Sequence, residues 1–458
     1  MARTVPKKRP RTASRAAPKA AVSDFRAKIR MYRQGLGDCF LISLPRAAGG
    51  RPYYVMIDCG VILGTADAGD KMTAVVENIA AATGGDIDLL LATHEHWDHL
   101  SGFAQAKDTF DKKLRVHEIW LAWTEDGKDE LTQKLKNEKK NALASLRLGL
   151  SRLQLAGDGD QAEELGGILD FFGAAKGAST SDALDNVRKM SPNLRYLRPG
   201  GDPIQPDGVT ARFYVLGPPH DEKMLRKINP SASGKETYGL ALDGLQMFMD
   251  GAGAALDAND KGRPFDQQYE IPFDYAQTLN FFRDNYWEPH DGQDGWRRID
   301  TDWLAGSTEL ALQLDSLTNN TSLAVAIELP NGDVLLFAAD AQVGNWLSWQ
   351  DLTWKVDGKT VSGPDLLKRA IFYKVGHHGS HNATLREKGL ELMKNLRLAM
   401  IPVDHDMAVK KRWGKMPLDE LVTALENQKA NTVVRVDRPK PQTQLQLVED
   451  KLFFEVTF

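Results

Sequence analysis

The chain has 458 residues, of which 42% are hydrophobic and 26% charged, a balance typical of a globular cytosolic protein. No uninterrupted apolar run reaches the roughly 18 residues that a membrane-spanning helix needs, so the sequence predicts a soluble, cytoplasmic protein without a membrane segment. Only two cysteines are present, which excludes a disulfide framework and an all-thiolate metal site.

The charge is unevenly distributed along the chain. The formal net charge is −4, but residues 1–20 hold seven of the 58 basic side chains and no acid, so the rest carries 51 basic against 62 acidic ones, or −11. The segment 1–24 lacks the apolar stretch of a secretory signal. We expect it to be a disordered basic tail, with nucleic-acid contact or targeting as the alternatives.

After the tail, the pattern is that of a layered α/β fold. Three short strands that end at Gly or Pro are expected first, then a helix, then a strand whose continuous apolar character indicates cover on both faces. These elements are predicted at residues 26–35, 38–45, 53–60, 71–82 and 87–94.

Two long stretches interrupt this pattern. Residues from about 125 to 190 are rich in Lys, Glu, Leu and Ala with helical spacing, and we expect a helical insertion there. Residues from about 220 to 316 are dense in Asp, Gly, Pro and aromatic residues, and we expect an irregular insertion. Because long structureless stretches are uncommon unless they are lids or binding elements, one of the two is expected to cover the active site.

The alternation of strands and helices resumes after the second insertion. A strand pair, a strand, a helix and another strand are followed by one more helix and a closing strand pair, so residues 25–458 are predicted to form a single α/β domain. The first five of these elements are predicted at residues 322–330, 333–340, 370–376, 385–396 and 398–404.

The strongest functional signal directly follows the buried strand that ends at His94. His94 and His96 are two residues apart on an extended chain and point the same way, while Asp98 and His99 follow in the turn toward the next helix. With ten histidines in the whole chain, this spacing is improbable by chance. One pair can hold one metal ion and the second pair another. Clustered imidazole and carboxylate groups favour Zn, Mn or Fe.

A second histidine cluster, made of His377, His378 and His381, also follows a predicted strand. Two strand ends at the same edge of a sheet can converge, so this cluster can supply the remaining metal ligand and a proton donor. Asp340 ends the strand between the two clusters. Such an acid alone is more often a helix N-cap, but beside two histidine clusters we favour a metal ligand.

These segments resemble the metallo-β-lactamase superfamily, whose HxHxDH signature stands here as His94, His96, Asp98 and His99. The strand GDCFLIS, the turn IDCG, the pair VLGPP and NNTSLAVAIELPNGDVLLFAADA, and KVGHHGS are similar to the hydrolase domain of ComEC-type DNA-uptake competence proteins. The resemblance implies a four-layer αββα sandwich with two insertions. It also implies two divalent metal ions, Zn before Mn or Fe, with Asp340 as the bridging acid and His377, rather than His378, as the last ligand.

Asn319 is the clearest departure from the superfamily. Many of its hydrolases have a histidine ligand three residues before the position of Ser322, whereas competence-type members tend to have Asn there. An amide oxygen is a poorer ligand than imidazole, so the resemblance implies weaker occupancy of one metal position. In the alternative, Asn319 points away and ties the start of the strand to a neighbouring loop.

The chemistry that we expect is hydrolysis by water activated between two metal ions. Asp98 would ligate one ion and orient the nucleophile. Whichever of His377 and His378 is not a ligand, or His381, can protonate the leaving group. Asp58 is the best candidate for an acceptor that orients a ligand imidazole, and a cap of the next turn is an equally good role for it.

For the substrate we favour a phosphodiester, with nucleic acid or a nucleotide ahead of a small choline-type ester, because of the likeness to DNA-uptake proteins. The net charge of −11 outside the tail argues against a broad surface for duplex DNA. A first alternative is a hydrolase of a lactone or thioester. A second is a non-catalytic, metal-binding interaction protein that keeps the fold.

Overall fold

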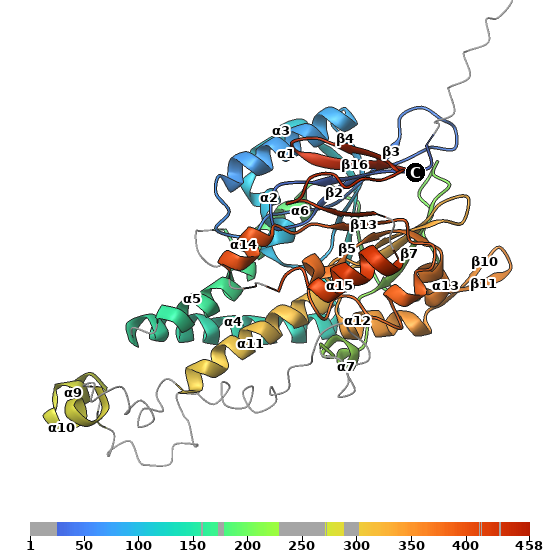
Figure 1. Cartoon of the computed structure of the whole chain (residues 1–458). Helices are drawn as coiled ribbons and strands as arrows, with labels where there is room; N and C mark the ends of the chain where they lie inside the picture. The colour runs from blue at the N-terminus through green and yellow to red at the C-terminus, as the bar shows by residue number, and fades with distance from the viewer. Residues whose placement is uncertain are drawn as a thin grey trace, which may run out of the picture.

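Two β-sheets lie face to face, and helices cover the outer face of each (Figure 1). This arrangement is the four-layer αββα sandwich that the sequence predicts. The computed structural model describes residues 25–156, 159–172, 178–228, 271, 273–287, 302–411, 413, 415–429 and 432–458. The predicted basic tail, 1–24, lies outside the described residues.

The first sheet has eight strands in the order β15-β16-β1-β2-β3-β4-β5-β6, of which β3 to β6 run parallel. The sheet is built from β1 (Lys28–Tyr32), β2 (Cys39–Leu44), β3 (Tyr53–Cys59), β4 (Asp86–Ala92), β5 (Arg115–Ala122), β6 (Leu194–Leu197), β15 (Gln446–Glu449) and β16 (Phe453–Thr457). The strands predicted before residue 95 are therefore confirmed.

The second sheet has six strands in the order β14-β13-β12-β9-β8-β7, of which β9, β12, β13 and β14 run parallel. It consists of β7 (Arg212–Gly217), β8 (Ala324–Glu328), β9 (Val334–Phe337), β12 (Ala370–Lys374), β13 (Leu398–Ile401) and β14 (Thr432–Arg435). A hairpin of β10 (Thr353–Val356) and β11 (Lys359–Ser362) stands apart from both sheets.

The space between the sheets is filled by apolar side chains from both. Phe40 of β2 meets Phe337 of β9 edge-on with ring centroids 5.9 Å apart, and Trp120 of β5 meets Phe213 of β7 in the same way at 5.3 Å. These residues belong to one continuous buried cluster. Side chains alternate between the faces of a strand, so this cluster fixes which polar residues at the strand ends can meet.

The outer face of the first sheet is covered by α1 (Ala68–Thr83), α2 (Trp97–Gln105), α3 (Lys107–Lys113) and α6 (Thr180–Lys189). In α1 the buried residues Met72, Val75, Val76 and Ile79 recur at helical spacing, which is why the predicted amphipathic helix packs on the sheet. The second sheet is covered by α12 (Val343–Ser348), α13 (Gly363–Lys368) and α15 (Asp419–Ala424), with α14 (His405–Lys410) nearby.

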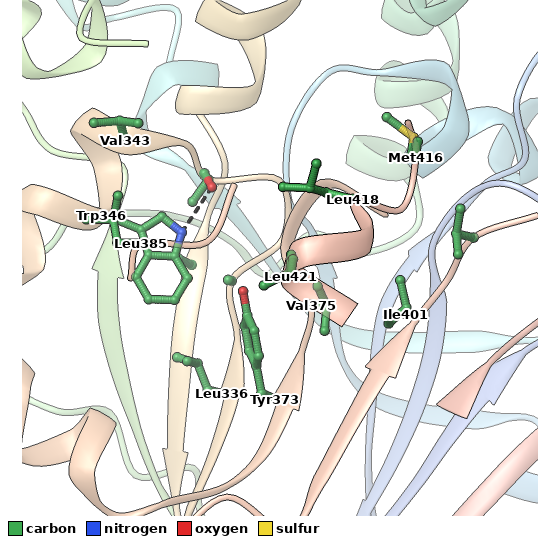
Figure 2. Close-up of a cluster of buried hydrophobic side chains, with 14 of the residues drawn as sticks. Leu336, Val343, Trp346, Tyr373, Val375, Leu385, Ile401, Met416, Leu418 and Leu421 are labelled. Carbon is green, nitrogen blue, oxygen red and sulfur yellow. Dashed lines mark hydrogen bonds between the residues drawn. The ribbon is translucent and has the colours of Figure 1, made fainter. Parts of the chain in front are cut away.

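Figure 2 shows part of the second outer layer, in which the ring of Trp346 of α12 lies beside that of Tyr373 of β12. Val375 and Leu421 of α15 belong to the same buried cluster. The Trp346 indole N–H donates to the carbonyl of Ala383 at 3.0 Å. Strand β12 is therefore buried on both faces, as its apolar sequence predicts, and its end is held firmly in place.

The helical insertion contains α4 (Glu130–Ala156), α5 (Gly159–Leu169) and a 3₁₀ turn at Asp170–Phe172 before α6. The second insertion is less irregular than expected. Helix α11 (Asp302–Asn320) fills its end, and α7 (Glu222–Leu225), α9 (Phe273–Thr278) and α10 (Asn280–Phe282) are short. Helices α4, α5 and α11 pack together on one side of the sandwich (Figure 1). The stretches 229–270 and 288–301 lie outside the described residues.

The helix predicted at 385–396 is wrong. These residues form turns with one 3₁₀ turn at Leu390–Leu392. Gly389 interrupts any helix with φ −137° and ψ −100°, and only glycine fits there, since an added Cβ would lie 2.3 Å from the Leu385 carbonyl oxygen. Among the helices of the described ranges, none combines the length and the apolar character needed to cross a membrane.

Candidate metal centre

The predicted histidines and acids meet at the ends of parallel strands from both sheets. β3 and β4 are neighbours in the first sheet, and β9 and β12 are neighbours in the second. The segments that follow these strands converge, because polar loops at the carboxyl ends of parallel strands share one edge. All of the predicted ligand side chains are buried there.

One half of the site is formed by Asp98, His99, Asp340 and His378. The His378 Nε2 lies 2.7 Å from Asp98 Oδ2 and 3.7 Å from Asp340 Oδ2, and the His99 Nε2 lies 3.2 Å from Asp340 Oδ2 and 3.6 Å from Asp98 Oδ2. Two ligands of a tetrahedral Zn²⁺ at about 2.0–2.1 Å are about 3.3 Å apart, so these four atoms have the spacing of a shared ion.

The carboxylate of Asp340 has one oxygen engaged and one free. Its Oδ1 accepts from the Lys374 ammonium at 3.0 Å and from the His377 backbone N–H at 3.1 Å, whereas its Oδ2 has no hydrogen-bond partner. The orphaned Oδ2 is the atom that faces the imidazoles of His99 and His378. Asp340 can therefore offer a single oxygen to a cation.

The other half of the site is formed by His94, His96 and Asn319. The His94 Nε2 lies 3.0 Å from the His96 Nδ1 and 3.1 Å from the Asn319 side-chain oxygen. The amide that stands in the usual place of a histidine therefore points into the site, and the alternative in which it points away is wrong. Asn319 comes from the last turn of α11 and not from a strand.

The imidazole of His99 is oriented by Asp58. The Asp58 Oδ2 lies 2.7 Å from the His99 Nδ1, and the same carboxylate accepts from the Thr93 backbone and hydroxyl. An acceptor at Nδ1 holds the proton there and leaves Nε2 as the ligand atom. Asp58 thus makes the contact that we expected of an orienting residue.

The two adjacent histidines face different groups, and it is His378 that lies beside the carboxylates, whereas the resemblance favoured His377 as the ligand. His377 lies with its Nε2 3.4 Å from the Asn319 amide nitrogen and its Nδ1 3.4 Å from that of Gln342, away from the carboxylates. His378 faces Asp98, and its Nδ1 lies 2.8 Å from the Pro402 carbonyl oxygen. His378 therefore lies among the groups that could hold a metal ion. Both residues have positive φ, 42° and 50°, which turns their side chains in directions that strand alternation does not predict.

His381, the other candidate proton donor, is half-buried beyond this turn. Burial, and then the nearby Lys415, lower its pKa, so the imidazole is neutral at pH 7. It contributes none of the contacts between the ligand atoms.

Two buried residues that sequence reasoning missed complete this half of the site. Lys374 donates to Asp38 Oδ2 at 2.6 Å, besides Asp340 and the Ala339 carbonyl oxygen, so all three of its protons are used. Asp38 belongs to a compact group with His99, Asp340 and His378. The Gly-Asp pair before β2 was the available signal, but nothing in it indicated a contact with a strand end some 340 residues later.

Asp98 and Asp38 lie on opposite sides of the imidazoles of His99 and His378. The Asp38 oxygens lie 3.8 Å and 3.7 Å from the Nδ1 atoms of His99 and His378, and those atoms already face Asp58 and the Pro402 carbonyl. The Nε2 atoms of the same rings face Asp98 and Asp340. We therefore assign Asp38 to the support of Lys374.

The turn that carries Asp98 is clamped by closely approaching backbone. Asp38 N–H donates to the Asp98 carbonyl at 3.0 Å, and an added Cβ on Gly60 would lie 2.4 Å from that carbonyl oxygen. Only glycine fits there, which fixes the distance between the loops that end β3 and β4.

The electrostatics of the metal-free protein are those of a site short of positive charge. Burial acts to lower the pKa of His99, but Asp340 and then Asp98 outweigh it and raise the pKa well above its usual value. Burial is the largest influence on His94 and His96 and lowers the pKa of both well below the usual range. The half around His94 and His96 thus presents neutral imidazoles, and the half around His99 and His378 presents carboxylates, which together are a donor set suited to divalent cations.

The helical insertion covers the site. Phe171 and Phe172 place their rings 5.3 Å and 5.1 Å from that of His96, and Phe171 stacks on Trp413 at 4.6 Å with an interplanar angle of 13°. Lys411 pairs with Asp170 beside this stack. As a result, the imidazoles and carboxylates of the site are at most 5% exposed.

Glu95, between the first two histidines, anchors that insertion. It pairs with Lys139 of α4 at 3.2 Å and accepts from the hydroxyl of Thr180 at the start of α6 at 3.0 Å. The metal-binding turn and the covering helices are thus joined directly.

The comparisons with known proteins agree with this geometry. Residues 34–181 match the family model of the metallo-beta-lactamase superfamily, whose members are usually hydrolases. No curated protein matches the chain. The match contains β2 to β5, α1 to α5 and all of the HxHxDH turn, whereas β1, β6, β15, β16 and the second sheet lie outside it. The fold, the buried donors and this match together identify residues 34–181 as a metallo-beta-lactamase superfamily domain.

Proposed function

We propose that this protein is a metal-dependent hydrolase of a phosphodiester. The observation that carries the proposal is the convergence of two groups of buried donors, one around His94 and His96 and one around His99 and His378, beside the single free oxygen of Asp340. Buried carboxylates and imidazoles with unpartnered atoms are costly unless something binds between them.

Two divalent ions, Zn²⁺ before Mn²⁺ or Fe²⁺, fit these donors. When bound, they lower the pKa of a water molecule and neutralise charge on a substrate oxygen. His94, His96 and Asn319 would hold one ion. Asp98, His99 and His378 would hold the other, with Asp340 shared.

The remaining residues orient the ligand side chains and exclude bulk water. Asp58 fixes the His99 tautomer, and Lys374 holds Asp340 so that one oxygen is presented. Phe171 and Phe172 keep bulk water from the imidazoles. With His378 engaged at both ring nitrogens, we propose that His381, which is neutral at pH 7, takes up a proton and passes it to the leaving group.

A small or single-stranded phosphodiester fits this site better than a duplex. The donors are buried under the aromatic cover, and the chain outside the basic tail carries a net charge of −11, which opposes a duplex-binding surface. The resemblance to competence-type proteins supports a nucleotide or nucleic-acid end as substrate. The same aromatic cover is also compatible with a neutral carbonyl group, so a lactone or thioester is the second candidate.

The test is turnover of a chromogenic phosphodiester against a chromogenic ester and a thiolactone by protein loaded with Zn²⁺ or Mn²⁺. We expect turnover of the phosphodiester, its loss in Asp340→Asn, and its retention in a variant of the distant surface pair, Lys107→Gln. Turnover of the carbonyl substrates alone would favour the second candidate. Metal binding without any turnover would indicate a non-catalytic protein.

A further inference from the structure

Asp315 is a buried acid on α11 that the sequence did not single out. It is 5% exposed, and within the described part of the chain it forms no ion pair with Lys or Arg. Burial raises its pKa well above the usual value, and Asp98 and Asp340 add to the shift. Burying a carboxyl group without a cationic partner destabilises the folded protein, so we expect a functional role for its contacts.

The first contact orients Asn319. The Asp315 Oδ2 accepts from the Asn319 side-chain nitrogen at 3.0 Å, which is the i, i+4 spacing of one helix face. The nitrogen end of the amide faces this carboxyl oxygen, which can accept from it whether or not the other oxygen carries a proton. The amide oxygen is thereby directed toward His94, 3.1 Å away.

The second contact concerns His96. This ring turns its Nδ1 toward His94, so it can ligate through Nδ1 only if its Nε2 carries the proton. That Nε2 lies 3.7 Å from the Asp315 Oδ1, and both atoms are buried without a hydrogen-bond partner. A closure of less than 1 Å would satisfy both.

We propose that Asp315 is a positioning residue for the metal position formed by His94, His96 and Asn319. It aligns Asn319 through one carboxyl oxygen and His96 through the other. It does for His96 what Asp58 does for His99. It also supports the one position that lacks a third imidazole, by presenting the amide oxygen in its place. This inference rests on the proposed metal-dependent function.

The experiment compares wild type, Asp315→Asn and Thr318→Val by calorimetric titration of the chelator-treated protein with Zn²⁺, together with the visible spectrum of the Co²⁺ form. An amide of the same shape cannot accept from both Asn319 and His96. We therefore expect Asp315→Asn to leave the affinity for the more tightly bound ion unchanged and to lower the affinity for the other ion by about 10–100-fold. The substitution should also alter the Co²⁺ spectrum. Thr318, on the same helix, donates only to the Leu314 carbonyl, so Thr318→Val should bind as wild type does.

Stability of the metal-free protein separates this role from a structural one. Replacing a buried, unpaired acid by an amide should leave the urea midpoint in chelator equal to or above that of wild type. If Asp315→Asn fails to fold, Asp315→Leu provides the same comparison. If wild type binds two ions and the Asp315 variants bind both with the same affinities, the role of Asp315 is overturned but the metal centre is not. Failure of wild type to bind any ion would overturn the metal centre, and this inference with it.

Discussion

Lys374→Met removes the lysine ammonium that contacts both Asp38 and Asp340. The Lys374 ammonium lies 2.6 Å from Asp38 and 3.0 Å from Asp340, and its side chain is 1% exposed. Burial acts to lower the pKa of Lys374, but the two acids outweigh burial and raise it, so the group is charged. Removing one partner of a buried ion pair costs about 3–5 kcal/mol, and here two carboxylates lose their partner. We expect at least that loss in the metal-free protein.

The assay is urea unfolding in the presence of a chelator, since a chain of this length shifts its melting temperature by only about 1 °C per kcal/mol. Lys368→Met is the matched control, because Lys368 pairs with Asp365 on the surface at 3.3 Å with 52% of its side chain exposed, and such pairs contribute about 0–1 kcal/mol. Equal effects of the two substitutions would refute the assignment of Lys374 as the internal counter-ion of the site.

Three further substitutions test other contacts. His378→Ala should lose one bound Zn²⁺ per chain by elemental analysis while His377→Ala retains both ions, and the reverse result would restore His377 as the ligand. Gly60→Ala should displace the Asp98 turn and abolish tight metal binding. Gly69→Ala, where an added Cβ meets nothing within 4 Å, should bind metal as wild type does. Equal metal binding by the two variants would show that the close approach at Gly60 does not hold the Asp98 turn in place. Phe171→Ala should destabilise the protein by about 3–5 kcal/mol and speed removal of Zn²⁺ by a chelator, and an unchanged rate would show that this ring does not limit access.

The sequence was sufficient for those parts of the site that a single strand end determines. His94 and His96 follow a buried strand with a spacing that sets both on one side, and Asp58 and Asp340 each end a strand of known direction. The parallel pairing of β3 with β4 in one sheet and of β9 with β12 in the other brings these ends to the same edge of each sheet.

The remaining features depend on geometry that residue patterns do not encode. The choice between His377 and His378 depends on two consecutive positive φ angles, a conformation that is uncommon for any residue except glycine even though histidine adopts it more often than most. Asp315 lies on a helix whose beginning was assigned to an irregular stretch, so its relation to Asn319 was not visible. Asp38 and Lys374 look like an ordinary turn acid and strand lysine until the two sheets are stacked.

The most direct test of the metal centre is anomalous diffraction at the zinc absorption edge from crystals of the Zn²⁺-loaded protein. Our account predicts two zinc peaks, one bounded by His94, His96 and Asn319 and the other by Asp98, His99 and His378, with lower occupancy for the first. Peaks confined to surface residues, or no peak between these side chains, would contradict it.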